Sequence, residues 1–254
     1  MPRIIAVAGK GGTGKTTLCG MIVRYLSEKD KGQVLAVDAD PNSNLNEVLG
    51  VKAPVSLGEI REEVLKTTAG ENAPGGMTKQ EYMDFMFGDA IEEEDNFDLL
   101  VMGRTQGEGC YCFINGILRK QIDKYANTYS HIVIDNEAGL EHISRGTLPK
   151  VDTLLLVSDC SRRGIEAAGR AAVLVDELKL KPAILKLVIN RAPNSELAPG
   201  ILEEIKTQNL DLLAVIPQDE NIYKYDSEGK PITTVPENSP IKVAISDIIN
   251  KLNL

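Results

Sequence analysis

A glycine-rich loop, Gly9–Thr17, follows an apolar run and precedes a helical pattern, and this order constrains the fold more than any other feature of the chain. The run Ile4–Ala8 is apolar throughout, as expected for a buried parallel strand. After the loop, apolar residues recur at helical spacing from Leu18 to Leu26. The order of strand, loop and helix predicts an α/β fold with an anion-binding loop at a helix N-terminus.

The residues of this loop explain how it would hold phosphate. Its glycines let successive backbone N–H groups turn toward one anion, and the dipole of the following helix adds partial positive charge at the same point. Lys15 can lie between the β- and γ-phosphates, and the Thr16 hydroxyl can bind Mg²⁺. We therefore predict a nucleotide with Mg²⁺ as the ligand, bound by Gly11, Gly12, Thr13, Gly14, Lys15, Thr16 and Thr17.

A second lysine, Lys10, lies ahead of the usual one. Because Lys15 already serves the loop's own nucleotide, Lys10 is available to reach a nucleotide held by another subunit. The chain is therefore predicted to form a nucleotide-driven homodimer, with both lysines in catalytic roles.

Beyond the loop, short β-rich runs alternate with longer helical patterns, which predicts a doubly wound, mostly parallel sheet with helices on both faces. We interpret residues 1–254 as a single domain with an insertion of helices and loops at about 51–95. The insertion offers surface for partners, and its acidic run, Glu92–Asp95, is interpreted as a solvated flank. The predicted strands are Ile4–Ala8, Val34–Asp38, Leu99–Met102, His131–Asp135, Thr153–Val157, Ile184–Asn190 and Leu212–Ile216.

Charge and hydropathy argue against several classes of protein. A net charge of −9 disfavours general affinity for nucleic acid. No apolar stretch approaches the ~18 residues of a membrane span, and no secretory signal is evident, so we expect a cytoplasmic protein. The C-terminal pattern Ile241–Leu252 is amphipathic but holds only two lysines, so packing on the sheet is a simpler interpretation than membrane binding.

Aspartates close two of the predicted strands, at the edge where a parallel sheet gathers its ligands. Asp38 and Asp40 are two residues apart and can face one side of an extended chain. One can help to hold Mg²⁺, while the other, taken to be Asp40, orients or deprotonates the attacking water. Asp135 ends a second strand, and the predicted magnesium ligands are Thr16, Asp38 and Asp135. Helix capping is the alternative role for each aspartate.

Together these segments resemble the deviant Walker ATPases, which include MinD, ParA and the nitrogenase iron protein. The resemblance spans most of the chain and rests on Lys10–Thr17, Asp38–Pro41, Asp135–Gly139 and Asn190-Arg191. It implies a P-loop ATPase of the deviant Walker A class, forming a face-to-face dimer in which Lys10 crosses to the nucleotide of the opposite subunit. By the same resemblance, Asp40 lies in switch I, Asp135 lies in switch II, Asn190 contacts adenine, and Pro217 lies in a segment that flanks the base.

The cysteines distinguish this chain within that family. Cys19 follows the phosphate loop and Cys160 follows an apolar run, so both are interpreted as small buried apolar residues. Cys110 and Cys112 differ, because they lie in a glycine-containing turn just before the helical pattern that starts at Phe113. Thiols at i and i+2 of such a turn can bind one soft metal ion, and the helix N-terminus favours the thiolate that a metal requires. Inert or redox-active thiols are the alternative.

Two thiolates are too few to close a structural metal site, which generally takes four ligands. A symmetric dimer whose axis passes between the two loops would supply four, in a tetrahedral site for Zn²⁺ or a square-planar site for Ni²⁺. Cys110 and Cys112 are therefore predicted to bind metal at the dimer interface.

With a CxC motif in this region, the chain resembles the CooC-type ATPases, which are nickel-binding maturation factors of carbon monoxide dehydrogenase. This resemblance implies an ATP-hydrolysing metallochaperone that delivers nickel to a client enzyme such as carbon monoxide dehydrogenase. A positioning ATPase like MinD or ParA is one alternative. The other is an iron–sulfur carrier or reductase like the nitrogenase iron protein, which the absence of cysteine from Asp135–Gly139 disfavours.

Overall fold

The computed structural model describes residues 2–29, 31–68, 74–88, 90–104, 110–139, 151–193 and 195–254, with side chains for all of these except residues 110–112. Its strands are β1 (Arg3–Gly9), β2 (Val34–Ala39), β3 (Ile91–Glu93), β4 (Asp98–Val101), β5 (His131–Asn136), β6 (Thr153–Ser158), β7 (Ile184–Ala192) and β8 (Leu212–Pro217). Its helices are α1 (Lys15–Glu28), α2 (Leu45–Leu49), α3 (Leu57–Thr67), α4 (Lys79–Gly88), α5 (Cys110–Tyr125), α7 (Arg162–Glu177), α8 (Pro199–Thr207), α9 (Glu220–Ser227) and α10 (Pro240–Leu252), with 3₁₀ turns η1 (Pro74–Gly76) and η2 (Ile232–Thr234).

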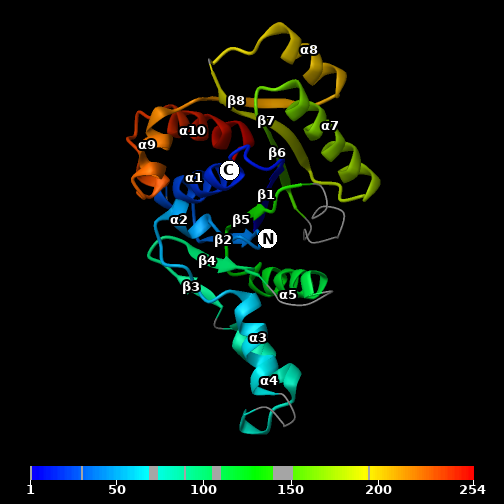
Figure 1. The fold of residues 1–254 in the computed structure, drawn as a ribbon, viewed down its shortest axis with the longest axis vertical. Helices are drawn as coiled ribbons and strands as arrows, with labels where there is room; N and C mark the ends of the chain where they lie inside the picture. The colour runs from blue at the N-terminus through cyan, green and yellow to red at the C-terminus, as the bar shows by residue number, and fades with distance from the viewer. Residues whose placement is uncertain are drawn as a thin grey trace.

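The strands form one eight-stranded sheet in the order β3-β4-β2-β5-β1-β6-β7-β8 (Figure 1). All described neighbours pair in parallel except β3, which is antiparallel to β4. The predicted fold class is confirmed. Each predicted strand matches an observed strand, and the bounds of the two differ by at most two residues at either end. The carboxyl ends of β1, β2 and β5 lie side by side, because Asp38 pairs with Asp135 and Asp135 pairs with Val7.

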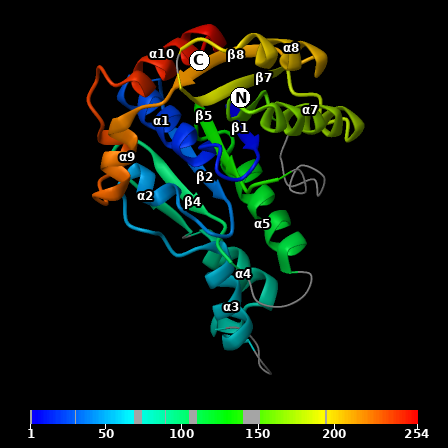
Figure 2. The ribbon, with the colours of Figure 1, turned by 45° about the horizontal axis from the view of Figure 1, so that its top comes forward.

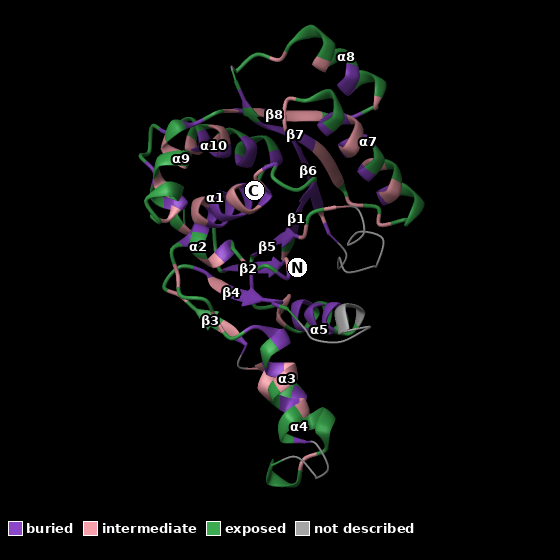
Figure 3. Ribbon diagram, in the orientation of Figure 1, coloured by how far each residue is buried: buried purple, intermediate pink, exposed green. Residues whose placement is uncertain are grey.

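Helices cover both faces of the sheet, and buried residues line the strands (Figures 2 and 3). The alternation of side chains along each strand divides the core into two clusters. In β1, Ile5 and Val7 belong to a cluster shared with α1, α2 and α10. The intervening Ile4, Ala6 and Ala8 belong to the other cluster, which α3, α4, α5, α7 and α8 complete. Because β1 is buried on both faces, it reads as a continuous apolar run.

The segment 51–95 contains a strand that the sequence analysis did not anticipate. It carries α3 and α4, which extend from the body near β4 in Figures 1 and 2, and then β3, at the edge of the sheet. Glu92 and Glu93 lie in β3 and are exposed. Their exposure agrees with the interpretation of the acidic run as a solvated flank, but they belong to a strand rather than to the expected helices and loops. A three-residue strand is too short for a periodic pattern, and charged edges are a common protection against unwanted strand pairing.

The C-terminal helix α10 packs against β8 and α1. Its buried residues are Ile241, Ile245, Ile248, Ile249 and Leu252. The apolar face that could have met a membrane is thus part of the core. In the described part of the chain, no helix combines the length and the apolar character needed to cross a bilayer.

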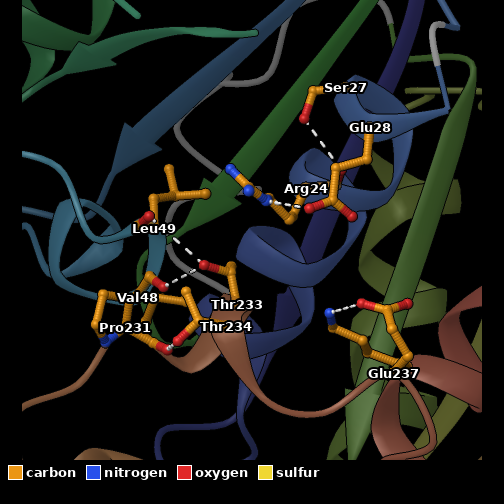
Figure 4. A network of polar contacts seen from close by, with 10 residues as sticks. Arg24, Ser27, Glu28, Val48, Leu49, Pro231, Thr233, Thr234 and Glu237 are labelled. Carbon is orange, nitrogen blue, oxygen red and sulfur yellow. Dashed lines mark hydrogen bonds and ion pairs between the residues drawn. The ribbon is translucent and has the colours of Figure 1, made fainter. Parts of the chain in front are cut away.

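The 3₁₀ turn η2 fixes the end of α2 (Figure 4). The buried Thr233 donates its hydroxyl toward the backbone carbonyls of Val48 and Leu49, at 3.3 and 3.5 Å. Beside it, Gly50 packs against Pro231, where a Cβ at Gly50 would come within 2.4 Å of Pro231 Cγ. The helix that follows the β2–α2 loop is therefore anchored at its far end.

Candidate nucleotide-binding site

The phosphate loop connects β1 to α1, and its backbone needs glycine. Gly12 and Gly14 adopt φ of 78° and 88°, in the region that L side chains rarely occupy. Gly14 is the N-cap of α1, and a Cβ there would come within 2.3 Å of the Asn190 side-chain nitrogen. The loop therefore brings the N-terminus of a 14-residue helix to the carboxyl edge of the sheet, as the sequence predicted.

The two lysines of the loop have different environments. Lys15 is 7% exposed, and its Nζ donates to the Lys10 carbonyl at 3.4 Å. The Thr13 hydroxyl donates to the same carbonyl at 2.9 Å. In contrast, the Lys10 side chain is exposed. One lysine is thus folded into the loop, while the other lies on the surface beside it.

Residues from the end of β7 hold the loop from the side. Asn190 Nδ2 donates to the Thr13 carbonyl at 2.8 Å, and Arg191 Nη1 donates to the Gly12 carbonyl at 3.1 Å. Arg191 adopts φ of 55°, a strained conformation for a non-glycine residue, and its N–H donates to Asn190 Oδ1 at 2.9 Å. Both polar groups of the buried Asn190 amide are thus engaged, although the sequence predicted this residue only as a contact to the base.

A cleft of about 410 Å³ opens next to this loop. Three residues predicted to bind nucleotide line it together: Thr17 from α1, Asn190 from β7 and Pro217 from the end of β8. Ile222 and Tyr223 of α9 line another part of it. A lining that combines polar groups with an aliphatic and an aromatic side chain, next to a phosphate-binding loop, is suited to a planar base.

The carboxylates of Asp38 and Asp135 are buried at adjacent strand ends. Burial raises the pKa of Asp38 to about 6 and that of Asp135 to about 7. A hydrogen bond with Thr16 acts in the opposite direction on the pKa of Asp135. Two carboxylates and a hydroxyl are the hard oxygen donors that Mg²⁺ prefers, so the residues present fit that ion. The structure brings together the three predicted magnesium ligands.

Asp38 also takes part in the capping that the sequence left open as its alternative role. Its Oδ1 accepts from the Asp40 N–H, and its Oδ2 accepts from the N–H of Leu45, the first residue of α2, both at 3.0 Å. Asp40 likewise accepts a hydrogen bond from the backbone two residues further along the chain. Its Oδ1 accepts from the Asn42 N–H at 2.8 Å and from Asn42 Nδ2 at 3.1 Å. Two successive turns built on aspartate side chains shape the β2–α2 loop.

Two further residues make contacts in the site that the sequence analysis did not anticipate. Asn136 is buried, and its Nδ2 donates to the Val7 carbonyl at 2.9 Å, linking β5 to β1. Cys19 is buried as predicted, but its thiol also lies 3.7 Å from Asp135 Oδ1. Asn136 could have been found from the sequence, because it directly follows an aspartate that ends a strand. No sequence signal indicates the contact of Cys19 with Asp135, because that contact depends on how α1 packs on β5.

Cys110 and Cys112 lie within the first turn of α5, rather than in a turn before it. The helix thus begins three residues before Phe113, where the sequence analysis placed its start. The two thiols lie outside the described side chains. Among the side chains that are described, no group of three or more His, Cys, Asp or Glu is arranged to hold a metal ion. Cys19 and Cys160 are free thiols.

The chain matches a known family of proteins and resembles several of its relatives. The family described as CobQ/CobB/MinD/ParA nucleotide binding domain matches residues 4–232. An uncharacterized ATP-binding protein of Methanocaldococcus jannaschii is 41% identical over 249 residues, which cover 98% of each chain. The carbon monoxide dehydrogenase accessory protein CooC of Rhodospirillum rubrum is 33% identical over 241 residues, covering 89% of this chain and 87% of CooC.

Among solved structures, the septum site-determining protein MinD of Pyrococcus horikoshii, complexed with Mg-ADP, has a similar fold. The TM-score is 0.73 at 25% identity, covering 100% of this chain and 96% of MinD. The fold therefore has a counterpart along the whole chain, in agreement with the predicted resemblance to MinD and ParA.

Proposed function

Because the chain belongs to the CobQ/CobB/MinD/ParA nucleotide-binding family, we propose that it is a Mg²⁺-dependent ATPase that dimerises on ATP and uses Cys110 and Cys112 to carry a soft metal ion, nickel, to a client enzyme. The observation that carries the ATPase part is the shared edge of β1, β2 and β5, where Lys15, Thr16, Asp38 and Asp135 meet. This set provides both a phosphate-binding loop and hard oxygen ligands.

In the proposed reaction, the backbone of Gly11–Thr17 and Lys15 hold the phosphates of ATP. Thr16, Asp38 and Asp135 would hold Mg²⁺, which supplies charge neutralisation at the phosphates when bound. Asp40 orients or deprotonates the attacking water. Asn190 and Pro217, which line the adjacent cleft, contact the base of the nucleotide.

Lys10 is the proposed contact across the dimer. Its side chain is exposed beside a loop whose own lysine is buried, which supports a role outside its own subunit. We expect Lys10→Ala to keep its affinity for ADP but to lose ATP-dependent dimerisation and most of its ATP turnover. Light scattering with and without a non-hydrolysable ATP analogue measures the first effect, and a K10A protein with unaltered turnover would show that the role is wrong.

The metal-carrying part rests on the CxC pair and on the 33% identity with CooC, a carbon monoxide dehydrogenase accessory protein. Nickel is the cargo here, and carbon monoxide dehydrogenase is the proposed client. Two thiolates from each subunit would give a four-sulfur site when two subunits close on ATP. If ATP and metal favour the same dimer, each must strengthen the binding of the other.

Calorimetric titration with Ni²⁺ tests this linkage. We expect a non-hydrolysable ATP analogue to tighten Ni²⁺ binding by about tenfold or more, which corresponds to a coupling of ~1.4 kcal/mol. C110S and C112S should each abolish binding while leaving ADP affinity intact. The matched control is C160S, which removes a half-buried thiol outside the pair and should bind Ni²⁺ normally. Equal Ni²⁺ affinities with and without the analogue would contradict the coupling.

A positioning role like that of MinD is a second candidate, favoured by the similarity to the MinD structure. Against a membrane-based version of it, α10 has its apolar face packed on β8 and α1. Liposome sedimentation with ATP separates the two roles. Retention on vesicles would favour positioning, whereas a protein that stays in the supernatant and binds Ni²⁺ through Cys110 and Cys112 would favour metal delivery.

A further inference from the structure

A relay of side-chain hydrogen bonds connects the β2–α2 loop to the end of β4, and the reaction proposed above does not use it. Asp40 Oδ1 accepts two hydrogen bonds from Asn42, one from the backbone N–H at 2.8 Å and one from Nδ2 at 3.1 Å. Asn42 Oδ1 in turn accepts from Arg104 Nη2. Arg104 thus reaches Asp40 through a single intervening amide.

We propose that Arg104 is a positioning residue for ATP hydrolysis, which fixes the orientation of the Asp40 carboxylate through Asn42. This inference rests on the role proposed for Asp40. The Asn42 amide can present either its nitrogen or its oxygen to Asp40, and only the nitrogen is a donor. By occupying the amide oxygen, the guanidinium of Arg104 keeps the nitrogen directed at the carboxylate.

The backbone before Arg104 is held firmly enough to serve as the base of this relay. The Met102 N–H donates to the Asp38 carbonyl at 2.8 Å, and the Met102 carbonyl accepts from the Gly58 N–H at 2.9 Å. Gly103, at φ of 67°, packs so closely on Ser56 that a Cβ would come within 2.2 Å of its hydroxyl oxygen. The chain leading to Arg104 is therefore bonded both to the end of β2 and to the start of α3.

The other end of the relay is also tied down. The Asp40 N–H donates to Asp38 Oδ1, and α2, which follows the loop, is capped by Asp38 Oδ2. Asp40 and Arg104 are thus fixed to neighbouring parallel strands, β2 and β4, and the exposed Asn42 bridges them. Because Arg104 is also exposed, its charge alone contributes little through solvent. The contribution we assign to it is orientation of the amide.

A double-mutant cycle on ATP turnover tests the relay. We expect R104M and N42A each to lower kcat by about tenfold, or ~1.4 kcal/mol, with KM for ATP within about twofold of wild type. The double variant should be no slower than N42A alone, because both changes break the same connection. R104K, which keeps a donor, should recover part of kcat. R170M removes an exposed arginine from the middle of α7 and is the matched control, with wild-type kcat expected.

Four results would contradict the relay. Additive losses in the double variant would mean that Arg104 and Asn42 act independently. A raised KM with kcat unchanged in R104M would mean that Arg104 contacts the nucleotide directly. Unchanged kcat in R104M, while D40N loses turnover, would remove the relay but leave Asp40 in its proposed role. A D40N protein with wild-type kcat would instead remove the role of Asp40 itself, and the relay with it.

Discussion

Two loops at the same edge of the sheet are held in opposite ways. The phosphate loop after β1 is held from outside, because Asn190 and Arg191 of β7 donate to the carbonyls of Thr13 and Gly12. The β2–α2 loop is shaped largely by the carboxylates of Asp38, at the end of β2, and of Asp40, which accept from the N–H groups of Asp40, Asn42 and Leu45.

This difference has consequences for how the two loops respond to a ligand. Amide and guanidinium donors keep their hydrogen bonds whether or not Mg²⁺ or phosphate is bound, so the phosphate loop is formed in advance. The carboxylates of the β2–α2 loop change their partners when they change charge or meet a cation. We infer that the first loop binds and the second loop responds, and each variant below tests one side of that contrast.

The largest effect on nucleotide binding is expected from Gly14→Ala in the phosphate loop. The substitution places a Cβ 2.3 Å from Asn190 Nδ2 and imposes φ of 88° on alanine. Strain of this kind costs about 1–3 kcal/mol, so ADP affinity should fall by up to roughly 100-fold because the loop loses its shape. Fluorescent-nucleotide titration measures this affinity.

Gly116→Ala provides the control for that variant. Gly116 lies in α5, where an added Cβ would meet nothing within 4 Å. Alanine there should leave ADP affinity unchanged and stabilise the helix by up to about 1 kcal/mol. Wild-type ADP affinity in G14A would show that the loop is adaptable rather than formed in advance.

A second effect, on the stability of the protein rather than on its affinity for nucleotide, is expected from Asp135→Asn. The folded protein holds the Asp135 proton up to a pKa of about 7, whereas an unfolded aspartate loses it near ~4. The folded state therefore binds more protons in this range, and the free energy of unfolding falls as the pH rises from about 4 to about 7. D135N removes this dependence on pH. Without nucleotide, its free energy of unfolding at pH 8 should therefore exceed that of wild type by about 2–4 kcal/mol, at ~1.4 kcal/mol per pKa unit.

Urea unfolding across this pH range measures the effect of D135N. The advantage should shrink below pH 7 and disappear near pH 4. D95N, in the exposed acidic run, should show no comparable gain at pH 8. A difference between D135N and wild type that is constant with pH would mean that the buried carboxylate is not what limits stability.

A third, smaller effect is expected from Asn190→Ala, and it decides how this residue serves the nucleotide. The family resemblance assigns Asn190 to adenine, whereas the structure engages its amide with Thr13 and Arg191. If the main role of Asn190 is to hold the phosphate loop, N190A should lower the affinities for ADP and GDP equally. The expected loss is about tenfold, because one buried hydrogen bond worth ~1–1.5 kcal/mol disappears. A loss confined to ADP would assign the residue to the base instead.

These contrasts also mark what the sequence could predict. Glycines that need positive φ, such as Gly12 and Gly14, and apolar runs such as that of β1 are local signals, so the phosphate loop and the sheet were predictable. The meeting of Asp38 and Asp135 followed from a general rule, because parallel strands end at one edge.

Contacts that depend on strand order were not predictable. Nothing local to Asn190 indicates the Thr13 carbonyl, and nothing near Arg104 indicates Asn42. Asp219 is a similar case: its Oδ1 accepts from the Asn221 N–H at the start of α9, and its Oδ2 accepts from the Ile241 N–H of α10. Its sequence neighbours signal the first cap, but only the fold brings the second helix to it.

The smallest effect is expected at the far end of α2, where Thr233→Val removes the hydroxyl that reaches the carbonyls of Val48 and Leu49 (Figure 4). These are long hydrogen bonds, so the free energy of unfolding should fall by about 0.5–1 kcal/mol. Thr234→Val, which removes a local bond to the Pro231 carbonyl at an exposed position, should change it by less than ~0.5 kcal/mol. If α2 is the fixed end from which the β2–α2 loop moves, T233V should also lower kcat for ATP slightly while T234V does not. A T233V protein that is destabilised but fully active would mean that the loop responds to its ligand without this anchor.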